Sequence, residues 1–342
     1  SRGHLNAIMM DIAENKGKAD IHYHHQCLDA NLDEGKITLK NLLTNEIIED
    51  SADLVFAADG AFSAVRYNAM QKTDRFNYSQ FFIEDGYKEL LLPADKDGNY
   101  QIEKNALHIW PRGRFMLIAL PNEDGSFTCT LFMPYDNHEY AFNDLDSDEK
   151  IDKFFKEVFP DFYALMPDIV ENWHQHPLSS LSIVRCQPWT IGKFALMGDS
   201  AHATVPFYGQ GMNAGFEDCS VMWDIYNEHK DWGKTFKIYS KERKPDGDAL
   251  QDLSLDNYYV MSADVADENF LLQKKIEARI HERHPEKWMP LYSQVTFSHI
   301  PYSKAYAQGK KQDEIMKEVL KDPLIEDKWD SLEIEEKILS LI

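Results

Sequence analysis

Residues 194–219 read FALMGDSAHATVPFYGQGMNAGFEDC, and this stretch decides the fold. It opens with an apolar run that predicts a strand ending just before Asp199. Small residues and a Pro-aromatic pair follow, and Gly209 and Gly211 lead into a helix that we expect to begin near Met212. Glycines at these places let backbone N–H groups approach a flat ligand, and the positive end of the helix favours a ligand that becomes anionic. The stretch therefore predicts a ligand site between a strand and a helix.

A carboxylate at the carboxyl end of a strand can accept hydrogen bonds from sugar or ribityl hydroxyl groups, and Asp199 has that place. A lone Gly-Asp is more often a turn or a helix cap, but the neighbouring Gly-Gln-Gly-Met-Asn run favours the ligand interpretation. A second stretch, DGAFSAVR at 59–66, places a carboxylate, small residues and a guanidinium directly after the apolar run 54–58. Taken alone, this second stretch predicts a strand-to-helix turn with an ordinary ion pair.

Composition excludes several classes of protein. The chain has 342 residues, 43% of them hydrophobic and 27% charged, which is enough to bury a substantial core. Lys and Arg total 36 against 58 Asp and Glu, and the resulting net charge of -22 argues against nucleic-acid partners and electrostatic membrane docking. The four cysteines are widely spaced and form no CxxC pair, which is typical of a reduced, cytoplasmic protein. A small molecule is the expected partner.

The sequence has no internal repeat and no linker-like stretch, so we expect its parts to form one intertwined unit. Leu5, Ile8, Met9 and Ile12 follow a helical spacing, with Ser1 in the place of an N-cap. Beyond Asn213 the pattern is almost wholly helical. Strands are expected at 21–28, 36–40, 47–50, 107–110, 115–120, 127–133, 181–186 and 193–197, and further helices at 146–159 and 162–172.

Together, the two turns resemble those of the flavin-dependent aromatic hydroxylases. That family has a strand ending in DGxxSxxR and, much later, GDAAH-like residues followed by a PxxGQGxN loop; this chain has DGAFSAVR, GDSAH and PFYGQGMN. The resemblance narrows to the members that act on L-kynurenine. The blocks that carry it are LHIWPRGRFMLIALPN at 107–122, FTCTLFMP at 127–134, DLSLDNY at 252–258 and PLYSQVTF at 290–297.

The resemblance implies an α/β (α+β) fold with an incomplete Rossmann-type FAD domain, an antiparallel substrate sheet and a C-terminal helical region. Residues 1–75 would be the remainder of the FAD domain, 76–190 the substrate sheet with surface helices, 191–230 the second FAD-binding segment, and 231–342 a helical cap and tail. The family begins with a βαβ unit carrying GxGxxG, which nothing in this sequence supplies. We therefore expect a missing upstream segment and poor FAD binding by this chain alone. The acidic, amphipathic tail predicts a soluble protein.

For the cofactor, the resemblance implies that Arg2 contacts the FAD pyrophosphate, that the main chain of Cys27 touches the adenosine part, and that Asp199 binds the ribityl chain. The helix dipole at the loop amides that meet the isoalloxazine would stabilise a reduced, anionic flavin. That loop comprises Gly211, Met212 and Asn213.

For the substrate, the resemblance implies that Asn257 and Tyr292 hold the amino-acid end of L-kynurenine, supplying an amide and a phenol within reach of a carboxylate. It also implies apolar walls for the pocket, at positions that would otherwise be taken for ordinary core. These positions are Phe132, Pro206, Phe207 and Met261.

The implied reaction belongs to tryptophan degradation. NADPH reduces FAD, the reduced flavin captures O₂, and a flavin C4a-hydroperoxide delivers one oxygen to the ring, so that no side chain need act as a nucleophile. Two alternatives stay open: a truncated or split fragment that cannot hold FAD alone, and an enzyme that hydroxylates or halogenates another aromatic compound. The absence of a WxWxIP motif counts against halogenation. The histidines at 22–25 and 281–284 lack ligand spacing, and no metal is expected.

Overall fold

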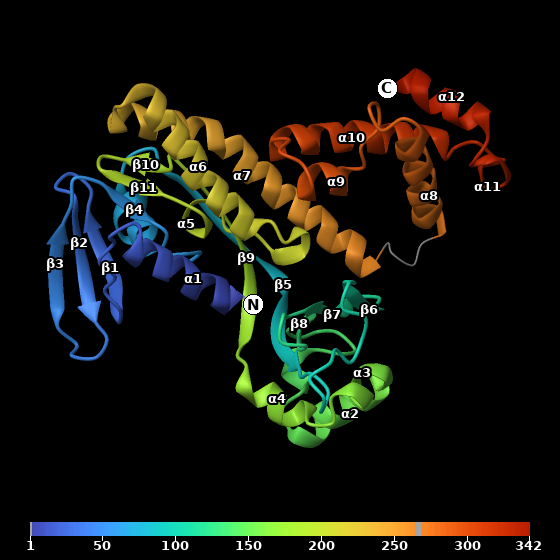
Figure 1. Cartoon of the computed structure of the whole chain (residues 1–342), viewed down its shortest axis with the longest axis horizontal. Coiled ribbons are helices and arrows are strands. Elements are labelled where there is room, and N and C mark those ends of the chain that lie inside the picture. The colour runs from blue at the N-terminus through green and yellow to red at the C-terminus, as the bar shows by residue number, and fades with distance from the viewer. Residues whose placement is uncertain (1, 264–267) are drawn as a thin grey trace. The chain divides into compact units, whose positions relative to one another are not determined.

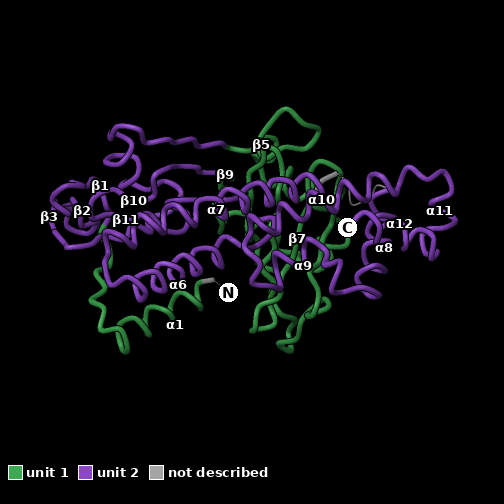
Figure 2. Tube along the Cα trace, turned by 90° about the horizontal axis from the view of Figure 1, so that it is seen from above, with its two compact units in different colours: residues 1–25, 82–181 green, residues 26–81, 182–342 purple. Residues whose placement is uncertain are grey.

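A computed structural model describes residues 2–263 and 268–342, which divide into two units. Unit 1 comprises residues 1–25 and 82–181, and unit 2 comprises residues 26–81 and 182–342 (Figure 2). All three crossings from unit to unit fall inside strands, which are β1 (His25–Asn31), β5 (Asn77–Leu92) and β9 (Leu178–Gln187). The units are therefore interleaved along the chain, and each has hydrophobic clusters of its own. The four functional segments expected from the sequence stay a prediction.

A five-stranded sheet with the order β6-β7-β8-β5-β9 organises unit 1. The predicted strands at 107–110, 115–120 and 127–133 are present, each displaced by no more than one or two residues at its ends, and successive strands pair in antiparallel fashion. They are β6 (His108–Arg112), β7 (Phe115–Pro121) and β8 (Phe127–Pro134). The predicted opening helix is α1 (Arg2–Asn15), whereas Ser1 lies outside the described residues.

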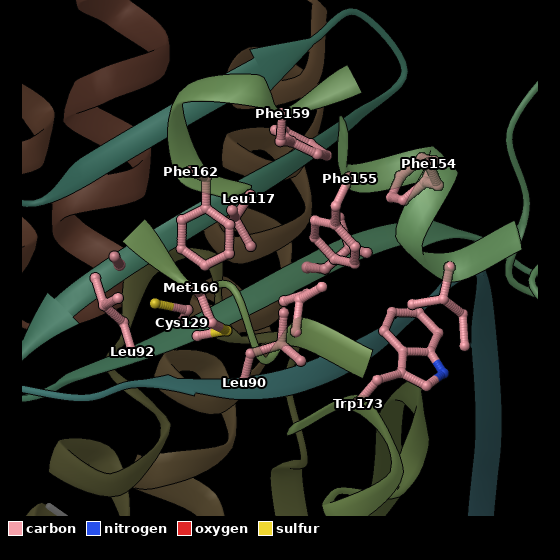
Figure 3. Packing of buried hydrophobic residues seen from close by; sticks show 14 of the residues in the cluster. Leu90, Leu92, Leu117, Cys129, Phe154, Phe155, Phe159, Phe162, Met166 and Trp173 are labelled. Carbon is pink, nitrogen blue, oxygen red and sulfur yellow. The ribbon is translucent and has the colours of Figure 1, made fainter. Parts of the chain in front are cut away.

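Three helices supply the other half of the unit 1 core: α2 (Asp148–Val158), α3 (Pro160–Leu165) and α4 (Ile169–Gln175). Figure 3 shows their aromatic side chains packed with residues from the strands, such as Leu117 and Cys129, both fully buried. The single helix expected at 162–172 is wrong, because the structure has two short helices there. Met166 precedes a proline, a position where helical backbone is disfavoured, and its φ of -132° and ψ of 75° end α3.

Unit 2 begins with an antiparallel meander whose strands have the order β1-β2-β3. These strands are β1 (His25–Asn31), β2 (Lys36–Asn41) and β3 (Ile47–Ser51). The expected start of the first strand at residue 21 is wrong, because Tyr23 and His24 form a turn in which His24 has a φ of +60°. The other two strands agree with the prediction.

A short parallel pair sets the position of the two turn stretches. β4 (Val55–Ala57) pairs with β11 (Phe194–Leu196), with Leu196 opposite Ala57, and β10 (Thr190–Ile191) extends the pair on the other side. The β11 residues are fully buried, so their apolar side chains hold this small sheet inside unit 2. Because the carboxyl ends of parallel strands meet at the same edge, both turn stretches begin at one edge of this sheet.

The predicted helical region beyond Asn213 is confirmed. Helices α6 (Gly211–His229) and α7 (Trp232–Ala263) pack side by side. Helix α10 (Tyr302–Val319) packs against α7 and α9 (Leu291–Thr296) (Figure 1). None of the helices in the described ranges is long and apolar enough to cross a membrane. The helices are α5 (Asp199–His202), α6 (Gly211–His229), α7 (Trp232–Ala263), α8 (Glu268–Arg283), α9 (Leu291–Thr296), α10 (Tyr302–Val319), α11 (Ile325–Lys328) and α12 (Leu332–Leu341).

Candidate functional site

Hydrogen bonds tie the two turn stretches together at the edge of β4 and β11. The Ser200 hydroxyl donates to the carbonyl oxygen of Ala57 over 2.5 Å. The buried guanidinium of Arg66 spans both stretches, because it donates to the carbonyl oxygens of Ser200 over 2.6 Å and of Ala61 over 2.5 Å. These hydrogen bonds hold the two turn stretches together at the edge of the sheet.

The ordinary ion pair expected within residues 59–66 is not what the structure shows. Arg66 bonds to backbone carbonyls and lies over the Tyr78 ring at 5.2 Å, and no ion pair joins it to Asp59 in the described part of the chain. The Asp59 carboxylate instead accepts a hydrogen bond from the Val65 amide over 3.3 Å. Arg66 is therefore a structural link, and Asp59 remains at the exposed rim of the turn.

Asp199 stands at the start of α5, directly after β11. It is exposed and makes no hydrogen bond or ion pair among the residues that the structure describes. The surrounding protein nevertheless raises the pKa of its carboxyl group by desolvation, and the charge of His202 opposes that rise. An unpaired carboxylate in partly dehydrated surroundings is well suited to accept hydrogen bonds from a ligand.

Two glycines near the turn have a positive φ, which residues with side chains rarely adopt. Gly198 has a φ of +56°, and a β-carbon added to it would lie 3.8 Å from the Cα of Gly215 on α6. Gly209 has a φ of +68°, and a β-carbon added there would meet no heavy atom within 4 Å. The first contact lets α6 pack onto the turn, and the second leaves open space beside the loop.

The helix predicted near Met212 begins at Gly211. Its first N–H groups have no partner within the helix, and Met212 and Asn213 are exposed, so the positive end of α6 is accessible. The Asn213 side-chain amide donates to the Gln210 side chain over 2.9 Å. The buried Thr204 hydroxyl, next to Gly211, has no hydrogen-bond partner among the described residues.

A buried network that the sequence analysis did not single out lies behind this edge. The Asp218 carboxylate accepts hydrogen bonds from the Gly198 amide over 2.9 Å, from His202 Nε2 over 2.6 Å and from Arg243 Nε over 2.9 Å. Burial alone would raise the pKa of Asp218, but the hydrogen bond from His202 and the charges of His202 and Arg243 hold it below its ordinary value. The network joins the turn, α5, α6 and α7.

A signal for this network was present in the sequence. Ala214, Asp218, Met222 and Ile225 recur at helical spacing and form the buried face of α6. A carboxylate in an otherwise apolar helical face requires buried partners, because an unpaired charge there is costly. The identity of those partners, on α5 and α7, could not be read from the sequence.

Asn257 and Tyr292 line one cavity of about 440 Å³ in unit 2. Asn257 is on α7 and Tyr292 on α9, and the remaining walls come from α8, α10 and the loop at Tyr208. The Tyr292 ring stacks on the Tyr208 ring with centroids 5.7 Å apart and planes 24° apart. The two residues predicted to bind the substrate are thus brought together.

The predicted apolar walls are distributed over both units. In unit 2, the Phe207 ring lies 4.7 Å from that of Tyr258, its carbonyl accepts from Asn257, and Pro206 begins the same short 3₁₀ turn. Met261 is close by, since its sulfur lies 3.4 Å from the Asn257 amide nitrogen. Phe132 is in unit 1, buried in β8 opposite Tyr87 of β5. The role of each as a pocket wall stays a prediction.

The remaining residues predicted to bind the cofactor are Arg2 and Cys27. Arg2 begins α1, but its side chain lies outside the described part of the structure. Cys27 is on β1 and packs against the cluster that surrounds β4 and β11. Partial burial and the nearby charge of Asp59 raise the pKa of its thiol, which places Cys27 close to the shared edge.

Unit 1 contains a cavity of about 620 Å³ that none of the predicted site residues lines. Its arginines are already engaged: Arg114 pairs with Glu84 and Asp85, and Arg112 donates to the Val158 carbonyl over 2.8 Å. Over the described ranges, no group of three His, Cys, Asp or Glu side chains has an arrangement that could hold a metal ion. The candidate site therefore comprises two parts of unit 2: the edge of β4 and β11, and the cavity that Asn257 and Tyr292 line.

Comparison with known sequences identifies the family of this chain. A family model described as an FAD binding domain matches residues 2–254. Kynurenine 3-monooxygenase of Flavobacterium psychrophilum is 50% identical over 344 residues, which is 100% of this chain and 76% of that protein. The enzyme of the same name from Myxococcus xanthus is 42% identical, over 93% of this chain and 68% of that protein.

Solved structures agree on the fold. A tetrameric form of 2-methyl-3-hydroxypyridine-5-carboxylic acid oxygenase has a TM-score of 0.60 at 22% identity, over 77% of this chain and 68% of that one. HpxO of Klebsiella pneumoniae, complexed with FAD and uric acid, has a TM-score of 0.58 at 14% identity, over 93% of this chain and 72% of that one. These likenesses confirm the predicted fold class.

Proposed function

Since the chain belongs to the kynurenine 3-monooxygenase family of FAD-binding proteins, we propose that it hydroxylates L-kynurenine to 3-hydroxykynurenine with FAD, NADPH and O₂. The observation that carries this proposal is that Asn257 and Tyr292 line a single cavity. The net charge of -22 argues against nucleic acid and membrane as partners, and the four free thiols support the reducing cytoplasm as the compartment.

The residues at the edge of β4 and β11 fit FAD. Asp199 offers an unpaired carboxylate to the ribityl hydroxyl groups, and the open space beside Gly209 lets a flat ring approach the backbone. The accessible amides of Gly211, Met212 and Asn213 would face the isoalloxazine at the positive end of α6. The unpartnered Thr204 hydroxyl is a further polar group that a ligand could satisfy.

When bound there, FAD supplies the redox chemistry that activates O₂. The positive end of α6 stabilises negative charge at that place. Asp218 and Arg66 hold the turns around it in fixed positions through their buried hydrogen bonds. No side chain of this chain needs to act as a nucleophile.

The substrate would bind in the cavity, with its amino-acid arm among the polar side chains. The Tyr292 hydroxyl would donate to the substrate carboxylate, and the Tyr208 ring, which stacks on Tyr292 and lines the same cavity, would form an apolar wall beside it. The half-exposed Tyr292 hydroxyl and the side chain of Asn257 offer polar groups to a zwitterionic arm in this cavity.

The test is NADPH oxidation by the full-length protein with identification of the product. L-kynurenine should be hydroxylated, whereas 4-hydroxybenzoate and salicylate, which lack the amino-acid arm, should not. Equal turnover of the plain benzoates would contradict the substrate assignment and leave a general aromatic hydroxylase. Flavin absorbance of the purified chain separates the enzyme from the alternative of a fragment that cannot hold FAD.

A further inference from the structure

Three carboxylates line the cavity that contains Asn257 and Tyr292, and two of them already have cationic partners. Asp256 pairs with Lys310 over 2.8 Å, and Glu277 pairs with Lys274 over 2.8 Å. Asp313, on α10, makes no hydrogen bond or ion pair among the described residues, although it is half-buried. Asp313 is thus a carboxylate on the cavity wall that lacks a partner.

The surroundings of Asp313 favour the arrival of a cation. Burial raises the pKa of its carboxyl group, and the charge of Glu277 raises it further, against the opposing charges of Lys274, Lys310 and Lys317. Each of those lysines is engaged by another carboxylate, Lys317 by Glu314 over 2.8 Å. The cavity wall therefore carries three acidic groups against two lysines.

Asn257 provides a second acceptor in the cavity that Asp313 lines. Its amide nitrogen donates to the Phe207 carbonyl over 2.8 Å and lies 3.4 Å from the Met261 sulfur. Both neighbours are acceptors, so the orientation of the amide is fixed, and its carbonyl oxygen has no partner among the described residues. That oxygen accepts hydrogen bonds, which suits an ammonium group rather than a carboxylate.

We propose that Asp313 is the counter-ion for the α-ammonium group of the substrate, with the carbonyl oxygen of Asn257 as the second acceptor. This inference rests on the proposed function and deepens it. It divides the amino-acid arm between two sets of groups: the ammonium lies at Asp313 and Asn257, and the carboxylate lies at the Tyr292 hydroxyl. Asp313 then selects α-amino acids over aryl keto acids of the same length.

The test compares two substrates in the full-length, FAD-loaded protein: L-kynurenine and its deamino analogue, 4-(2-aminophenyl)-4-oxobutanoate. Asp313→Asn should raise the KM for L-kynurenine by about tenfold, as expected for one lost charge-assisted hydrogen bond, and leave the KM for the analogue unchanged. Asp313→Glu should restore part of the preference for L-kynurenine. Flavin content should match the wild type, and the melting temperature of Asp313→Asn should be equal or slightly higher at pH 7, because a desolvated charge is removed.

A matched control removes a carboxylate from the next position of the same helix. Glu314 is exposed and pairs with Lys317 outside the cavity wall, so Glu314→Gln should leave both KM values unchanged. Equal increases for the two substrates in Asp313→Asn, or no increase at all, would overturn the assignment of Asp313 while leaving the proposed function intact. A wild-type protein that neither binds nor hydroxylates L-kynurenine would overturn both.

Discussion

Two carboxylates next to Gly198 have opposite surroundings: Asp199 follows Gly198 in the chain, and Asp218 accepts a hydrogen bond from the Gly198 amide. Asp199 is exposed and unpaired within the described residues, and desolvation raises the pKa of its carboxyl group. Asp218 is fully buried, accepts three hydrogen bonds, and has a lowered pKa because His202 and Arg243 outweigh the effect of burial. The same residue type thus joins a buried network at one position, whereas at the other it has no partner among the described residues, as a residue predicted to bind a ligand should.

The largest expected effect is a loss of stability when Asp218 is substituted. Asp218→Asn keeps the shape but removes the fully buried charge that accepts hydrogen bonds from Gly198, His202 and Arg243, and Arg243 keeps only Glu217 and Asp246 as ion-pair partners among the described residues, so the free energy of unfolding should fall by about 3 kcal/mol. Urea denaturation at pH 7 measures this change. Glu217→Gln is the matched control, because Glu217 also pairs with Arg243 but is 41% exposed, and its loss should be below about 1 kcal/mol. Equal losses in the two variants would contradict the role assigned to Asp218.

The next prediction is a smaller effect on substrate binding in the cavity, without an effect on FAD binding at the edge of β4 and β11. Tyr292→Phe removes one hydrogen bond to a charged group, about 1.5 kcal/mol, and should raise the KM for L-kynurenine by roughly tenfold. Flavin content should remain that of the wild type, because Tyr292 is on α9 and lines only the cavity. Steady-state kinetics at fixed NADPH measure the change, and unaltered kynurenine kinetics would show that the cavity does not hold the substrate.

The smallest effect concerns the stability of the protein without FAD. The pKa of Asp199 is raised above 3.8 in the folded state, so its charged form is disfavoured by folding at neutral pH. Asp199→Asn should therefore raise the melting temperature slightly at pH 7, and the difference should disappear as the pH falls below about 3.8, where both states are protonated. A lower melting temperature for the variant at pH 7 would mean that Asp199 has a structural partner.

The comparison also shows what sequence alone can predict. The strands of the parallel pair and the start of α6 were predicted because apolar runs and glycines mark them locally. Asn257 and Tyr292 were predicted as a pair from the resemblance, and the structure brings them to one cavity. Their roles as ligands stay predictions.

The partners of buried polar groups could not be predicted. Arg66 was expected to pair with Asp59, its neighbour in sequence, but its partners include a carbonyl on Ser200, which only the pairing of β4 with β11 brings near. The three donors to Asp218 likewise come from segments far from it in sequence: Gly198 and His202 at the two ends of α5, and Arg243 on α7. Such contacts depend on tertiary packing rather than on local pattern.

The central claim is that Asp199 and the start of α6 form the FAD site of this chain. Titration of the full-length apoprotein with FAD, wild type against Asp199→Ala, tests it most directly. Loss of one charge-assisted hydrogen bond should weaken binding by about 1.5 to 3 kcal/mol, which is roughly tenfold to a hundredfold in Kd. An unchanged Kd in a folded variant would contradict the claim and reduce Asp199 to a turn residue.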